Sequence, residues 1–271
     1  MTKATGGNSK SVTKPFLSGT VTDETTPKSA LIFFGSLLLV GFMSFLISAT
    51  TAGAALWIRL LLNVAIILLI LSVFYSNGTG RGTDAVSRGE ILWQKQEKGQ
   101  PVSESERRLS YHGLKGFAVG ILGTLPLLVP ALMLAFMTKV QTTDSGTLPS
   151  WIQSYVGREE VGGALVHYTQ PQGMAFVDYV RLIVRLFLMP FVNIAGSANR
   201  LSILWVERFS PLLTILPAAA YGLGYRTGRK NRTRIHTAIS ENNRIRIRRE
   251  KKARKARLQG ASRKKEPEQL N

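Results

Sequence analysis

Two apolar segments decide the fold: ALIFFGSLLLVGFMSFLISA (Ala30–Ala49) and AALWIRLLLNVAIILLILSVFY (Ala54–Tyr75). Each is about as long as the roughly 20 residues that a helix needs to cross a hydrocarbon core about 30 Å thick. Only the uncharged stretch Thr50–Gly53 separates them. Because a second apolar helix follows the first at once, we expect residues 30–75 to form a transmembrane hairpin rather than a cleaved signal peptide.

Two further apolar segments lie downstream, at Leu114–Met137 and Phe209–Tyr225. The first has the length of a full span, and the second is shorter. We expect spanning helices over residues 114–137 and 209–225. The fold class is therefore all-α: a polytopic helical membrane bundle with four spanning helices.

A fifth apolar segment, Met174–Ala195, differs from these four because it carries Asp178, Arg181 and Arg185. The three charges fall near one helical stripe, as in a helix that lies at an interface. We therefore expect residues 174–208 to form one amphipathic or re-entrant hairpin that does not cross the membrane.

Lysine and arginine are unevenly distributed in this chain, whose net charge is +19. They gather in the lead (residues 1–29), in the segment 76–113 and in the tail (residues 226–271). Segments of this kind stay in the cytoplasm. Four crossings with both termini cytoplasmic fit this pattern and make residues 138–173 an outer loop. The rival arrangement, five crossings with an outer N-terminus, places the basic lead and middle segment outside.

Two polar segments beside the first hairpin carry no apolar pattern. The lead is rich in Thr, Ser, Gly and Lys, which predicts a flexible segment. The stretch NGTGRG (Asn77–Gly82) lacks the Gly-Lys-Ser/Thr sequence and the preceding strand of a phosphate-binding loop. We expect it to be a flexible turn that opens a cytoplasmic loop over residues 76–113.

Small residues recur in the third predicted span, at Gly116, Gly120 and Gly123. This spacing lets another helix backbone approach closely in a membrane. We expect these glycines to be helix-packing positions within this chain, with self-association as the alternative.

Side chains suited to catalysis are sparse. The chain has no cysteine, its three histidines stand in separate segments, and the four predicted spans contain no Asp or Glu. We expect no catalytic residue, no metal and no cofactor. Asp178, Arg181 and Arg185 form the candidate intramembrane polar cluster, either as an Asp178–Arg181 pair with Arg185 at the headgroups or as a functional site.

The tail after Tyr225 has seventeen basic and four acidic residues and no Phe, Tyr or Trp. Without aromatic platforms it is poorly suited to reading RNA sequence. Its partners are expected among anionic lipids, ribosomal or other nucleic acid, and acidic proteins. We expect a basic helical or disordered tail whose polyanion contacts are Arg244, Arg246, Arg248, Arg249, Lys251, Lys252, Arg254, Lys255 and Arg257.

These patterns predict a non-enzymatic scaffold, assembly factor or accessory subunit in a lipid bilayer, the plasma membrane of a bacterium. Its basic tail would bind anionic lipid, ribosomal RNA or an acidic partner, and another membrane subunit could join it. The alternative is a transporter or channel component with an anion path near Arg181 and Arg185.

Overall fold

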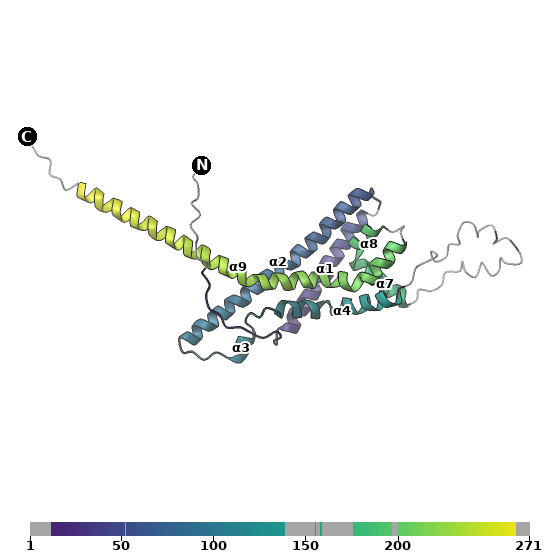
Figure 1. Cartoon of the computed structure of the whole chain (residues 1–271), viewed down its shortest axis with the longest axis horizontal. Coiled ribbons are helices and arrows are strands. Elements are labelled where there is room, and N and C mark those ends of the chain that lie inside the picture. The colour runs from purple at the N-terminus through teal and green to yellow at the C-terminus, as the bar shows by residue number, and fades with distance from the viewer. Residues whose placement is uncertain are drawn as a thin grey trace, which may run out of the picture.

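A computed structural model describes residues 12–51, 53–138, 155, 158, 176–196 and 200–263 (Figure 1). All regular structure in these ranges is helical. The helices are α1 (Thr26–Thr50), α2 (Leu56–Glu97), α3 (Glu104–Arg108), α4 (Lys115–Met137), α7 (Phe176–Phe187), α8 (Met189–Ala195) and α9 (Arg200–Arg263). Most of the predicted outer loop, 138–173, lies outside the described residues.

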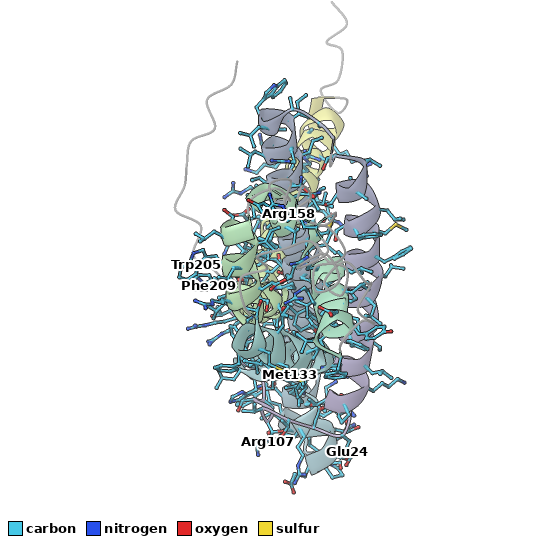
Figure 2. All side chains as sticks on the ribbon, turned by 90° about the vertical axis from the view of Figure 1, so that its right-hand side faces the viewer. Glu24, Arg107, Met133, Arg158, Trp205 and Phe209 are labelled. Carbon is cyan, nitrogen blue, oxygen red and sulfur yellow. The ribbon has the colours of Figure 1, made fainter. Side chains whose placement is uncertain are left out.

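Four of these helices, α1, α2, α4 and α9, are long and apolar enough to cross a membrane. The all-α class and the four candidate spans are confirmed, and they indicate an integral membrane protein. Phe33, Phe74, Val119 and Tyr221 contribute one residue from each of the four to a shared core. The exposed aromatic pair Trp205 and Phe209 lies outside that core, stacked on the outer surface of α9 (Figure 2).

Two of the candidate spans continue well beyond a membrane. The 42 residues of α2 and the 64 residues of α9 correspond to about 63 Å and about 96 Å of helix, whereas a hydrocarbon core is about 30 Å thick. We call the end of the bundle from which the C-terminal half of α9 leaves the arm side (Figure 1). The opposite end, where α1 connects to α2, is the loop side.

The predicted flexible turn at Asn77–Gly82 is wrong, because this stretch lies inside α2. Gly78 is buried, and a Cβ there would overlap the carbonyl oxygen of Tyr221 on α9. In return, a Cβ on Gly224 of α9 would overlap the carbonyl oxygen of Tyr75. Glycine therefore serves here to bring two helix backbones into contact rather than to end a helix.

This contact, together with Gly82 and Gly228 one turn further along, forms what we call the glycine seam. The two helices run parallel through it, and α2 pairs more extensively with α9 than with any other described element. The segment 76–113 is therefore not a simple loop: α2 occupies it as far as Glu97, and only residues 98–114 form the connection to α4.

Sequence neighbours α1 and α2 are joined by a short turn, as predicted, but they hardly pack on one another. Helix α8 packs against both of them. At the loop side, Asn193 of α8 donates to the carbonyl oxygen of Ser48 at 2.7 Å. The fully buried Asn63 of α2 accepts from the Ser48 hydroxyl at 2.9 Å. Polar side chains of α1, α2 and α8 are thus hydrogen-bonded to one another at the loop side.

The described part of the lead that the sequence predicts to be flexible, residues 12–25, is hydrogen-bonded to the bundle, and we call it the strap. Its backbone donates from Leu17 to the Gly89 carbonyl at 3.1 Å and from Gly19 to the Tyr111 carbonyl at 3.0 Å. Asp23 forms a buried ion pair with Lys115 at the start of α4. Composition favours disorder here, but backbone hydrogen bonds to α2 and to the α3–α4 connection fix the segment in place.

The glycine seam gives a matched pair of variants. We expect Gly78→Ala to lower the free energy of unfolding by about 1–3 kcal/mol, because its Cβ meets backbone that cannot move aside. Gly80→Ala on the same helix meets nothing within 4 Å and should raise stability by about 0.5–1 kcal/mol. Unfolding of the full chain in detergent micelles measures both, and equal effects would contradict the seam.

The strap gives a pH dependence. Burial by itself would raise the pKa of Asp23, but hydrogen bonds from Lys115, Thr26 and Thr25 outweigh it and lower the pKa below its ordinary value of 3.8. A carboxyl group whose pKa is lowered by folding stabilises the folded state at pH values above its ordinary pKa. This stabilisation is lost as the pH falls through the pKa of the folded state. The stability difference between the native chain and Asp23→Asn should therefore stay constant from about pH 7 to about pH 5 and shrink below about pH 4.

Candidate functional site

The predicted polar cluster of α7 has a partner on α9 that completes it. Glu207 has a side chain only 4% exposed, and it accepts from Arg181 Nε at 3.0 Å and from Arg185 Nε at 2.8 Å. The hydroxyl of Thr138, just after α4, donates to its other oxygen. Arg181 also donates to Asp178 at 2.7 Å. Three elements thus converge on one buried carboxylate.

The chemistry of this Glu207 cluster suits a structural role, in which ion pairs hold helices together. Two guanidiniums face two carboxylates, so the cluster has no excess charge with which to attract an anion. In a low-dielectric site such pairing satisfies charges that would otherwise be very unfavourable to bury. Sequence reasoning anticipated the Asp178–Arg181 pair, but it left Arg185 at the headgroups, whereas Arg185 pairs with Glu207.

A second buried carboxylate lies on the arm side, and sequence reasoning missed it. Glu90 of α2, with 6% of its side chain exposed, accepts from Arg232 Nη2 at 2.9 Å, and its other oxygen lies within hydrogen-bond distance of His236 Nε2, at 2.8 Å. Arg232 and His236 are one helical turn apart on α9, and this i, i+4 spacing was the available signal. His236, which stands in a separate segment from the other histidines in the sequence, is thus paired with Glu90 in the structure.

Further contacts fix the same part of α9, residues 226–240, which we call the root. Asn231 donates to the hydroxyl of Thr83 on α2 at 3.3 Å. The strap reaches it as well, because the backbone of Val12 donates to Thr237 at 3.1 Å. With Glu90, these contacts hold the root against α2 and the strap over about two turns of helix.

The helix-packing glycines of α4 all face elements of this chain. A Cβ on Gly116 would overlap Tyr225 of α9, and one on Gly120 would press on Ala218. A Cβ on Gly123 would press on Ala30 and Phe33 of α1. The three glycines therefore let α4 lie close to both α9 and α1.

Beyond the root, α9 continues as what we call the basic arm, residues 241–263. Every described side chain from residue 241 to 258 is exposed. Arg246 pairs with Glu250 at 2.9 Å on the surface of the helix. The nine predicted polyanion contacts, Arg244 to Arg257, are spread around the whole circumference, since successive residues are about 100° apart. The arm therefore presents positive charge in all directions rather than on one face.

Within the described ranges, no three His, Asp or Glu side chains are arranged as a metal-ligand set. No protein-family model matches this chain, and no curated protein or solved structure matches it. Function is therefore inferred from the side chains themselves, above all from the basic arm and the contacts at its root.

The Glu207 cluster yields a stability prediction. Glu207→Gln keeps the shape but leaves Arg181 and Arg185 without their shared carboxylate, which should reduce the free energy of unfolding by about 3–5 kcal/mol. Glu250→Gln breaks an exposed pair and should change it by less than about 1 kcal/mol. Denaturation in detergent compares the two. An equally small effect at both positions would show that the cluster does not tie α7 to α9.

Proposed function

We propose that this protein is a non-enzymatic membrane scaffold that anchors a basic helical arm and presents it to a polyanion in the cytoplasm. The observation that carries this proposal is the continuity of α9, which runs without interruption from its apolar stretch to Arg263. About 57 Å of this helix lies beyond Tyr225. The arm consequently extends away from the bundle instead of folding back on it (Figure 1).

Fixation of the root supports this proposal. A basic tail on a flexible hinge would sample all directions, whereas the root of this arm is held by a buried ion pair of Glu90 with Arg232 and by the strap. The four transmembrane helices then serve as an anchor that sets the direction of the arm. This arrangement suits a scaffold or accessory subunit that positions a large partner near the membrane.

Nucleic acid, such as ribosomal RNA, is the polyanion that the arm fits best. A helix that lies on anionic lipid buries an apolar face in the headgroup layer. The arm has no such face: Ile245 and Ile247 lie about 160° apart around the helix, and Leu258, which is on the side of Ile247, is three turns further along. Contacts with phosphates require only exposed cations and no aromatic stacking, which agrees with the composition of the tail.

Orientation follows from the same charges. The arm, the root and the basic residues of the α2–α4 connection all lie on the arm side, and the positive-inside rule assigns that side to the cytoplasm. We propose that both termini are cytoplasmic, in the plasma membrane of a bacterium. Helices α7 and α8, of 12 and 7 residues, are then a re-entrant or amphipathic element at the outer side.

The alternative function, a transporter or channel with an anion path near Arg181 and Arg185, has less support. Both guanidiniums pair with the buried Glu207, so an anion would have to compete with that carboxylate. Solute flux that is abolished by neutralising both arginines in a stably folded variant would favour this alternative.

The arm can be tested by salt-dependent RNA binding. The full chain, in nanodiscs of zwitterionic lipid, is titrated with double-stranded RNA over a range of salt concentrations. Replacing Arg244, Arg246, Arg248 and Arg249 with Gln should make the slope of log affinity against log salt shallower by about 3, since each phosphate contact contributes about 0.7–0.9. The exposed arm tolerates these changes because its side chains support no packing.

A control with equal charge loss replaces Lys95, Lys98, Arg107 and Arg108 on the same side of the bundle. It should leave the slope nearly unchanged. Equal losses of slope in both variants would show that RNA binding depends only on the total positive charge. That result would contradict a dedicated role of the arm. Failure of the native chain to bind RNA at low salt, with strong binding to anionic vesicles, would assign the arm to lipid instead.

A further inference from the structure

The basic arm, residues 241–263, has ten basic and two acidic residues. Its nine cations from Arg244 to Arg257 are distributed around the whole helix, and neighbouring directions are nowhere more than about 60° apart. Every described side chain from residue 241 to 258 is exposed, so none of these cations packs against the bundle. The distribution of their charge therefore bears on the shape of the partner that the arm can bind.

Eight of these cations form two groups on opposite sides of the helix. Four lie within about 80° of one another around the helix axis, and we call them the first face: Arg244, Arg248, Lys252 and Lys255. Four others are centred about 180° from the first group, and we call them the second face: Arg246, Arg249, Arg254 and Arg257. Arg246 pairs with Glu250, but this pair is exposed and therefore weak. The arm thus has two faces of four cations each.

A flat or convex polyanion would use only one of these faces. A helix with its side chains is about 10–12 Å wide, whereas the Debye length is about 8 Å at 0.15 M ionic strength. When the arm lies on such a surface, the cations on its far side are therefore largely screened from the phosphates. On a bilayer, or along the outside of a duplex, about half of the charge of the arm would contribute little to binding.

A groove with phosphates on both walls would use the two faces at once. Such a groove has to be about 10–12 Å wide to admit a helix, and the major groove of regular A-form RNA is too narrow. An internal loop removes the base pairs that fix the distance between the two strands, so the groove can widen there. Folded RNA interrupted by internal loops therefore offers a site of suitable width for the arm.

The way in which the arm leaves the bundle allows this kind of contact. The hydrogen bonds that hold the root end at Thr237, which accepts from the backbone of Val12. Beyond Ser240, no described side chain up to residue 258 is even half-buried. The arm is consequently a free-standing helix that projects away from the bundle (Figure 1). Both faces are open to the same partner.

We propose that the arm inserts into a groove of folded RNA that an internal loop has widened. Phosphates of one strand contact the first face, and phosphates of the other strand contact the second face. This inference rests on the RNA-binding function proposed above and specifies the kind of RNA that the arm fits. Because the contacts are made with phosphates, they select the shape of the RNA rather than its base sequence.

The two faces give a matched pair of variants with equal loss of charge. The full chain, in nanodiscs of zwitterionic lipid, is titrated over a range of salt concentrations with an RNA duplex that contains an internal loop. Replacing all four cations of the first face with Gln should make the slope of log affinity against log salt shallower by about 3, since each phosphate contact contributes about 0.7–0.9. The same replacement on the second face should have the same effect. Gln has nearly the helix propensity of Lys and Arg, and circular dichroism verifies that both variants remain helical.

A loss of slope in only one of the two variants would show that the RNA lies on one side of the arm and would overturn the proposal. Unchanged slopes in both would also overturn it, because the RNA could then use whichever face keeps its charge. The native chain should bind the looped RNA at least about tenfold more tightly than the same duplex without the loop, and equal affinities would contradict a widened groove. If the native chain binds neither RNA, the function proposed above fails as well, whereas a one-sided loss of slope contradicts insertion alone.

Alkylation of single cysteines tests the same geometry without any change of charge. The chain has no cysteine, and Ile245 and Ile247 are exposed and lie about 160° apart around the helix. With an uncharged reagent, the looped RNA should slow alkylation of both Ile245→Cys and Ile247→Cys well beyond the limit of about twofold that applies when each face is covered in only half of the complexes. Ser105→Cys, at an exposed position of α3, should react at an unchanged rate. Protection of only one of the two arm cysteines would overturn the proposal.

Discussion

The close approach of α2 and α9 at the glycine seam is the constraint on which the rest of the structure depends. Where Gly78 and Gly82 meet Tyr221 and Tyr225, the two backbones touch and leave no space for a Cβ. Association in lipid has little hydrophobic drive, so such contacts between small residues supply much of the packing energy. Because both helices remain unbroken through the seam, they leave the membrane side by side and carry their polar halves into contact on the arm side.

Buried carboxylates fasten the bundle on either side of this seam. On the arm side, Glu90 joins α2 to the root of α9, and on the loop side, Glu207 joins α9 to α7. Each accepts from an arginine on another element, and removing one partner would leave an uncompensated charge in a low-dielectric environment. The two ion-pair clusters therefore fix the register of α9 at both ends of its span and thereby the direction in which the arm projects.

Two consequences of this arrangement bear on function. Because the root is fixed, the basic tail projects from the bundle in one direction. A fixed direction would help to hold a large partner, whereas a tail that only sets the orientation in the membrane would not need it. The pairing of α2 with α9 also leaves few contacts between α1 and α2, and α8 packs against both of them. The proposed scaffold role thus depends on this choice of helix partners.

Length and hydropathy alone determined the class of the protein, its four candidate spans, the segment that is too charged to be a fifth, and the basic tail. They also pointed to Asp178, Arg181 and Arg185, but not to the carboxylate that completes their cluster. Only the tertiary structure decided that Asn77–Gly82 is helical, that residues 12–25 are strapped to α2, and that α1 and α2 separate. The physical reason is that apolar patterns report how each segment meets lipid, whereas glycine seams and buried ion pairs depend on partners far away in the sequence, which local propensity does not encode.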